Sequence, residues 1–355
     1  MILRLISILR ENDCLHFLPA FRAEGVEDGH LGKLTDRHLR LLGVERLGDR
    51  MRLLEAFAPR KSAPEKEHSA AGSRSAKLLS EDSRTDPPLA ISIQTESGAV
   101  PGVQADGEKD RGISLEIRGG CELEFKWCPP GSFVMGSPFS ELGRGVDEGP
   151  VNVRILNGFW MGRTQVTQEV WGAVMGSSPS HRSGPLRPVE NVTWEDAMRF
   201  VEGASRLLRI PVGYRMALPT EAQWEYACRA GTTTPFHFGG TLSSAQANYD
   251  GNYPYGYSEP GSFLEETADC GSYPPNAWGL CEMHGNVWEW CSDWYSEQLA
   301  GGDDPQGPDA GPGRVYRGGS WHSIADHCRS AFRYYLPPGS YHMFLGFRVA
   351  LVANP

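Results

Sequence analysis

Aromatic residues are nearly absent from the first third of the sequence. Of its 36 Phe, Trp and Tyr residues, only Phe17, Phe21 and Phe57 precede Phe125, and all ten Trp and twelve Tyr follow it. Residues 59–110 contain neither an aromatic residue nor a cysteine and are rich in Ser, Ala, Pro, Gly and charge. Such a segment buries too little apolar area to offset its chain entropy. We therefore predict two unlike domains, at 1–58 and 111–355, joined by a disordered linker at 59–110.

Long hydrophobic runs and an excess of basic residues are also missing. No stretch approaches the roughly 18 apolar residues that span a bilayer, and Arg4 and Arg10 interrupt the apolar N-terminus. The formal net charge is -10, which disfavours binding to nucleic acid or to anionic lipid. We expect a cytoplasmic protein that contacts neither membrane nor nucleic acid.

Cysteine is sparse as well. Eight cysteines in 355 residues are too few for a disulfide scaffold, and none has the C-x-x-C spacing of a zinc or redox site. Phosphate-binding glycine loops are absent too. The composition thus excludes several common site types and leaves the function to be sought in longer motifs.

The N-terminal domain reads as short helices, with Leu47, Met51 and Leu54 spaced along one helical face. The stretch LTDRHLRLLGVERLGDRMRLLEAF resembles the sterile alpha motif (SAM) domain, a five-helix bundle. That resemblance implies self-association or binding of a protein partner. The alternative is a small helical bundle that has no partner.

The C-terminal domain combines short apolar segments with many Gly, Pro and Trp residues. Three helices are predicted, near Thr167–Met175, Thr193–Leu208 and Thr220–Arg229. Thr220 with Gln223 forms a capping-box pattern that begins the third helix. The remainder should be short strands and ordered loops, so we predict an α+β domain with little regular secondary structure.

Longer phrases in this domain identify a family resemblance. PPGSFVMGS, PVENVTWEDAMRF, LPTEAQWEYACRAGTTTPF, NAWGLCEMHGNVWEW, RVYRGGSW, CRSAFR and LGFRVA occur in this order. Together they resemble the formylglycine-generating enzyme, or sulfatase-modifying factor, family from about Glu122 to Val352. The resemblance implies a C-type-lectin-like fold. It also implies an oxidase that converts a sulfatase cysteine to formylglycine with oxygen and copper(I) held by two thiolates.

The copper-binding cysteine pair implied by the resemblance is incomplete. In the run RGGSWHSIADHC the second position is Cys328, whereas the first is Ser323. A hydroxyl is a poor ligand for the soft copper(I) ion. We therefore expect a catalytically degenerate domain that recognises a protein or peptide ligand. The alternative is a working copper oxidase with Cys328 as its catalytic thiol.

The resemblance further implies structural calcium, which oxygen ligands suit. A second family site would use Asn248 and the Tyr249 carbonyl, although its remaining partners are not evident. For Glu289 the alternative is an ion pair with an arginine. The positions that match the first family site are Glu282, the carbonyls of Gly285 and Val287, and Glu289.

The segment between RGGSW and LGFRV is rich in residue types that are favoured at recognition surfaces. In retroelement-diversified relatives of the lectin-like fold, this segment forms the variable ligand-binding surface. The alternative is that these side chains belong to the core. The predicted ligand-binding residues are His322, Ile324, Tyr334, Tyr335, Tyr341, His342 and Phe344.

Overall fold

The computed structural model divides the chain into two compact units, Met1–Glu96 and Ser97–Pro355. It describes residues 112–117, 120–256 and 258–354 together with nine earlier residues. The predicted five-helix bundle and the predicted linker therefore lie almost wholly outside the described residues. None of the helices in the described part has the length and hydrophobicity needed to cross a bilayer. The nine earlier residues are Ile8, Leu9, Leu31, Leu34, Leu39, Val44, Leu53, Ala56 and Phe57.

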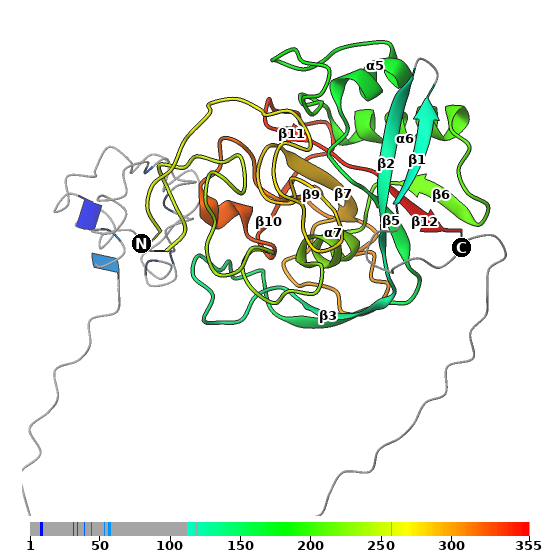
Figure 1. Cartoon of the computed structure of the whole chain (residues 1–355). Helices are drawn as coiled ribbons and strands as arrows, with labels where there is room; N and C mark the ends of the chain where they lie inside the picture. Colours follow the sequence, from blue (N-terminus) through cyan, green and yellow to red (C-terminus); the bar gives the residue numbers. More distant parts are fainter. Residues whose placement is uncertain are drawn as a thin grey trace, which may run out of the picture. The chain divides into compact units, whose positions relative to one another are not determined.

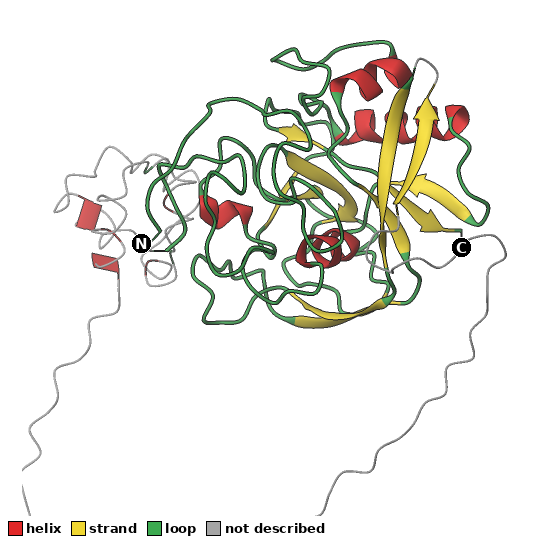
Figure 2. Ribbon diagram, viewed as in Figure 1, coloured by secondary structure: helices red, strands yellow, loops and turns green. Residues whose placement is uncertain are grey.

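The second unit is mostly sheet with few helices, and loops connect its short strands (Figures 1 and 2). This arrangement agrees with the predicted α+β domain of low regular structure. The helical elements are α5 (Gln168–Met175), α6 (Trp194–Leu207), α7 (Glu221–Arg229) and the short 3-10 helix η3 (Ala325–Cys328). The strands are β1 (Gly112–Ile117), β2 (Cys121–Cys128), β3 (Gly131–Met135), β4 (Val151–Ile155), β5 (Phe159–Gly162), β6 (Tyr214–Ala217), β7 (Trp288–Trp294), β8 (Gly302–Asp303), β9 (Arg314–Arg317), β10 (Arg333–Leu336), β11 (Leu345–Gly346) and β12 (Ala350–Ala353).

The strands form three sheets whose order differs from their order in the sequence. One sheet runs β1-β2-β5-β12-β6, a second runs β10-β9-β7-β11, and a third runs β3-β4-β8. Strand β12 pairs antiparallel with both β5 and β6, so the end of the described chain lies inside the largest sheet. Every sheet therefore joins segments that are distant in sequence.

The three predicted helices are confirmed, and their side-chain caps explain where they begin. Thr193 caps α6 and Thr220 caps α7, each in a reciprocal capping box, which satisfies free N–H groups of the first turn. Helix α6 buries Ala197, Phe200 and Ala204 on one face. That three-and-four spacing places one apolar stripe against the core.

Tryptophan supplies much of the packing in this loop-rich unit. Five of the ten Trp side chains are buried and the other five are half-buried. Trp171 stacks on Phe200 at 5.7 Å between ring centroids, and both rings make T-shaped contacts with Phe347. Such ring pairs stabilise a fold beyond the area that they bury, so aromatic contacts link helices α5 and α6 to the C-terminal strands.

Buried arginine–carboxylate pairs connect the segments further. Arg329 donates to both oxygens of Glu148 at 2.8 Å. Burial raises the pKa of Glu148, but the bonds and charge of Arg329 outweigh it and hold this pKa below its ordinary value. Removing one member of such a pair costs roughly 3–5 kcal/mol, because the other charge stays buried. The other pairs in this part of the chain include Arg317 with Glu225, Arg333 with Glu221, and Arg348 with Glu289.

Candidate functional site

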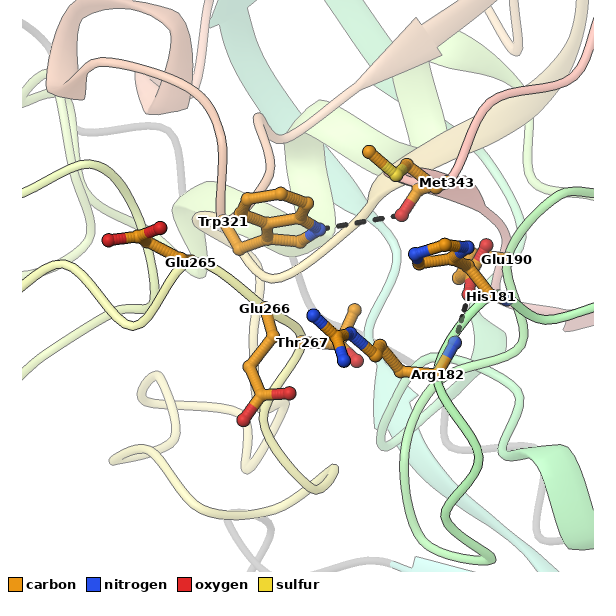
Figure 3. A pocket seen from close by; sticks show the side chains of 8 residues that line it. All are labelled: His181, Arg182, Glu190, Glu265, Glu266, Thr267, Trp321 and Met343. Atoms are coloured by element: carbon orange, nitrogen blue, oxygen red, sulfur yellow. Dashed lines mark hydrogen bonds between the residues drawn. The ribbon is translucent and has the colours of Figure 1, made fainter.

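A small cavity lies where four loops meet in the second unit. Its volume is about 60 Å³, whereas one water needs roughly 15 Å³. The cavity therefore has room for the end of a side chain but not for a whole small molecule. Figure 3 shows the eight residues that line it: His181, Arg182, Glu190, Glu265, Glu266, Thr267, Trp321 and Met343.

Glu190 is the most deeply buried acid of this cavity, with only 1% of its surface exposed. Its Oε1 accepts hydrogen bonds from the backbone N–H of His181 at 2.5 Å and from that of Arg182 at 3.4 Å. Its Oε2 is buried and has no hydrogen-bond partner in the described structure. Burial raises the pKa of Glu190 to about 7, because an ionised carboxylate loses hydration there.

Side-chain and backbone bonds hold the cavity walls together. Arg187 Nη1 donates to Glu266 Oε2 at 3.1 Å and to the Thr267 carbonyl at 2.6 Å. Trp321 Nε1 donates to the Met343 carbonyl at 3.4 Å. The backbone N–H of Asn191 donates to the His342 carbonyl at 3.0 Å. The site is thus assembled by contacts between four separate stretches of the chain.

Three of the predicted ligand-binding residues lie in an aromatic row beside the cavity. The His322 ring is 5.2 Å from Trp321 and 6.1 Å from Phe344, and Phe344 stacks on His342 at 5.0 Å. His322 and His342 are exposed, whereas Phe344 is half-buried. We call these three residues, together with Trp321, the aromatic rim.

The other predicted ligand-binding residues are elsewhere or are not joined to the rim. Tyr334 and Tyr335 lie on β10, where Tyr334 contacts Tyr316 and Tyr335 stacks on Tyr295 at 4.1 Å. They pack against two different core clusters, because neighbouring side chains of a strand point to opposite faces. Ile324 is half-buried next to η3, and Tyr341 is exposed.

The predicted copper positions are both buried. Cys328 has no exposed surface, and its pKa is raised by burial. Ser323 is 6% exposed, accepts from the Ser320 N–H and lies 3.1 Å from the Ser320 hydroxyl. Burial of the thiol disfavours its thiolate form, and a hydroxyl is a poor ligand for copper(I), so these residues do not fit the ion as they stand.

The first predicted calcium position is surrounded by oxygen atoms, as calcium requires, but an amide nitrogen takes the central place. Gln165 Nε2 lies 2.9–3.4 Å from the carbonyl oxygens of Glu282, Gly285 and Val287 and from Glu289 Oε1, and these four acceptors share its two N–H groups. Glu289 also accepts from Arg348 and Trp224. The ion pair with an arginine, the alternative to calcium at Glu289, is thus present.

The orientation of the Gln165 amide follows from the backbone. Asn286 Oδ1 accepts from the Ala268 N–H at 2.9 Å, and Asn286 Nδ2 donates to the Ala268 carbonyl and to Gln165 Oε1. This chain leaves only the Gln165 NH₂ to face the four oxygens. As arranged, these residues do not fit an additional cation, and the expected calcium requires Gln165 to move away.

The Glu282 carboxylate points away from this oxygen cluster. Its Oε1 accepts from the N–H groups of Gly271 and Tyr273, and its Oε2 is buried without a hydrogen-bond partner in the described structure. At the second calcium position Asn248 Oδ1 also lacks such a partner, and Tyr249 is buried. Among the described residues, no group of three or more His, Cys, Asp or Glu side chains could hold a metal ion.

Met343 lies in the predicted recognition segment, but sequence reasoning missed the other residues that line the cavity. Glu190 carries a usable signal, since it is an acid directly after a buried valine in PVENVTW. Trp321 ends the phrase RVYRGGSW, whose residue types indicate the family but not a place in a cavity. His181, Arg182 and Thr267 give no signal, because only the folded chain brings their loops together.

Comparison with known proteins covers nearly all of the second unit. The family model described as "Sulfatase-modifying factor enzyme 1-like domain" matches residues 123–353. The formylglycine-generating enzyme of Mus musculus is 34% identical over 198 residues, and the match covers 51% of this chain and 50% of that protein. The serine/threonine-protein kinase pkn1 of Chlamydia pneumoniae is 33% identical over 240 residues, 59% of this chain and 35% of the kinase. The chain thus spans half or less of the length of these relatives.

Solved structures share the fold of the unit. Treponema denticola variable protein 1 superimposes with a TM-score of 0.57 at 28% sequence identity. The match covers 69% of this chain and 99% of that protein. The likeness therefore extends over the complete fold of that protein.

Proposed function

The chain belongs over residues 123–353 to the family of sulfatase-modifying factor enzyme 1-like domains, and from this premise we propose that it is a recognition protein. In this proposal the family fold binds a protein or peptide ligand and does not oxidise a cysteine. The ligand docks at the cavity near Glu190 and on the aromatic rim.

The state of the predicted copper ligands carries this proposal. Copper(I) chemistry in the family relies on two thiolates, and here one position is Ser323 while Cys328 is fully buried. Burial also raises the pKa of the Cys328 thiol, which disfavours the thiolate that copper(I) needs. The other described cysteines are poor candidates for the missing copper ligand, since Cys121 and Cys270 are half-buried and the remaining four are buried.

The aromatic rim supports the proposal that this domain binds a protein or peptide ligand. His322 and His342 expose flat rings beside a cavity that has a buried acid in its wall. Rigid rings give contact area at low cost in conformational entropy. Treponema denticola variable protein 1, whose fold this unit shares, is named for variability, which is compatible with a recognition role.

A copper assay tests this proposal against the oxidase alternative. The purified chain is loaded with copper(I), and oxygen-dependent aldehyde formation is followed on a cysteine-containing peptide. We expect neither stoichiometric copper binding nor turnover. Turnover that is lost in Cys328→Ala would show that the protein is an oxidase and refute the proposal.

For residues 1–58 we propose association, either with a second copy or with a protein partner. The SAM-like helical pattern supports this role, and a tether to the second unit would raise the local concentration of binding sites. Sedimentation of the full chain should show concentration-dependent assembly that a chain lacking residues 1–58 does not show. Equal monomeric behaviour of both chains, with no partner captured by the first, would contradict it.

A further inference from the structure

One buried carboxylate holds an exposed loop of the second unit. The loop, residues 177–182, begins after Gly176, whose left-handed conformation (φ 67°) ends helix α5. We call these six residues the strap, and none of them is buried. Glu190 lies instead in a buried stretch, where the neighbouring Val189 N–H donates to the Val166 carbonyl at 2.8 Å. An exposed segment is thus attached to an acid that the core holds in place.

The bonds that attach the strap converge on Glu190. Its Oε1 accepts from the backbone N–H groups of His181 and Arg182, two consecutive residues of the strap (Figure 3). Its own N–H donates to Ser180 Oγ at 3.2 Å. Three successive residues of the strap therefore depend on the position and the charge of one acid.

The residues after the strap are attached by a neutral side chain. Gln168 Oε1 accepts from the Gly184 N–H at 3.1 Å, and Gln168 Nε2 donates to the carbonyl of Arg182 at 2.8 Å. An amide does not change its charge with pH. The attachment of residues 183–186 should therefore respond less to pH than the attachment of the strap.

Glu190 is buried without a counter-charge. Its two side-chain bonds come from backbone groups, and within the described residues no cationic side chain is paired with it. Its Oε2 is buried and has no hydrogen-bond partner in that part of the chain. Burial therefore raises the pKa of Glu190 to about 7. The protonated acid still accepts both N–H groups at Oε1, so it holds the strap without a buried charge.

Other charged and titratable side chains lie around the same cavity or on its rim. The hydrogen bond and charge of Arg187 hold the pKa of Glu266 below its ordinary value, so Glu266 keeps its charge between pH 5 and pH 8. A protonated histidine would favour ionised Glu190, so the imidazole of His181 requires its own control. The groups are His181 and Arg182 on the strap, Glu265 and Glu266 on a second loop, and His322 and His342 on the aromatic rim.

We propose that Glu190 is a pH-sensitive latch, which holds the strap closed while its carboxyl group is protonated and releases the strap as the group ionises. Once the strap opens, water reaches the carboxylate and the ionised form is no longer penalised. The strap supplies His181 and Arg182 to the cavity wall, so its opening removes one side of the cavity. This switch goes beyond the proposed recognition function, because it operates whether or not a ligand binds.

The sign of the pH dependence follows from the direction of the pKa shift. A carboxyl group with a raised pKa destabilises the closed form progressively between its ordinary pKa of 4.5 and the raised value of about 7. The equilibrium constant for opening should therefore rise roughly five- to tenfold per pH unit between pH 5 and pH 7. Above pH 8 it should level off, because Glu190 is then ionised in both forms.

Hydrogen exchange of the full chain, resolved to single amides and corrected for the pH dependence of intrinsic exchange, measures this opening. Protection of the His181 and Arg182 N–H groups should fall by that factor, whereas protection of the Gly184 N–H should change less. Strand β7 reports global unfolding, which is also pH-dependent because burial raises the pKa of Asp293 to about 7. Constant protection of the strap, or equal pH slopes in the strap and β7, would overturn the inference.

Three variants identify the titrating group. Glu190→Gln keeps an oxygen for both N–H groups but does not ionise, so protection of the strap should no longer vary with pH relative to β7. His181→Gln keeps the backbone N–H and should retain the wild-type slope. Glu202→Gln is the matched control, since Glu202 is exposed on α6 and does not line the cavity.

A slope that persists in Glu190→Gln, or one that disappears in His181→Gln, would overturn the assignment to Glu190. If Glu190→Gln does not fold, the wild-type comparison with β7 and the His181→Gln profile still decide. None of these results bears on the copper assay, where turnover would refute recognition and leave the latch intact. The latch and the proposed function therefore fail in different experiments.

Discussion

Gln165 provides a sharp test of how this fold is held together, because its amide nitrogen lies where the family resemblance places calcium. If the amide is a sufficient partner for the four surrounding oxygens, calcium is not needed. Chelation with EDTA should then leave the melting temperature of the wild-type protein unchanged. The expectation follows from the four contacts of 2.9–3.4 Å to Gln165 Nε2.

Gln165→Leu removes this nitrogen and leaves buried acceptors without their donor. Two of its contacts, to the Val287 carbonyl and to Glu289 Oε1, are short at 2.9 and 3.0 Å. Each buried group left unsatisfied costs roughly 1–3 kcal/mol, although Arg348 still bonds Glu289. The expected total is about 2–4 kcal/mol, or a fall in melting temperature of roughly 5–15 °C for a unit of this size.

Gln165→Glu should create a metal dependence that we do not expect in the wild-type protein. Its carboxylate adds an oxygen ligand and a charge to the cluster, which are what calcium prefers. Calcium at about 100 times its dissociation constant would stabilise this variant by roughly 2.7 kcal/mol, and EDTA would reverse the effect. Gln298→Leu, at an exposed position, is the control. A wild-type melting temperature that falls on chelation would refute the reasoning and favour a calcium ion with Gln165 displaced.

Three further predictions concern other buried groups. Arg329→Met should lower the free energy of unfolding by roughly 3–5 kcal/mol in urea titrations, because Glu148 stays buried without its partner; a loss under 1 kcal/mol would contradict this. Asp293→Asn should stabilise the protein at pH 8 but not near pH 4. The reason is that burial raises the pKa of Asp293 to about 7, so the wild-type protein loses stability as pH rises from about 4 to 7, and a constant difference across pH would be inconsistent with it. Cys328 should resist iodoacetamide in the folded protein and react after unfolding, as mass spectrometry can show; rapid native labelling would mean that the thiol is accessible.

The local parts of the fold were predictable because their causes are local. The hydroxyls of Thr193 and Thr220 each accept a hydrogen bond from the backbone N–H three residues later, at the start of a helix. Such capping patterns can be recognised from the sequence alone. The phrases from PPGSFVMGS to LGFRVA likewise indicated the family that the comparisons show. Periodicity served less well for the short strands, since strands such as β8 and β11 comprise only two residues each.

The candidate site was predictable only in part. His322, His342 and Phe344 lie in one segment, so their composition indicated a binding surface, and they lie together beside the cavity. Tyr334 and Tyr335 belong to the same aromatic-rich segment, but each packs against a core cluster. Neighbouring side chains of strand β10 point to opposite faces, and both faces are covered by packed residues. Residue type alone does not separate these two cases.

By itself the sequence determined the helix starts of the second unit, the family and the replacement of one expected copper ligand by Ser323. The tertiary structure decided which polar groups meet. It placed the Gln165 amide among four oxygens and left one oxygen of Glu190 buried without a hydrogen-bond partner in the described structure. These outcomes depend on contacts between loops that are far apart in sequence. A buried polar group costs free energy unless it finds a hydrogen-bond partner, so the arrangement of the loops decides which groups are satisfied.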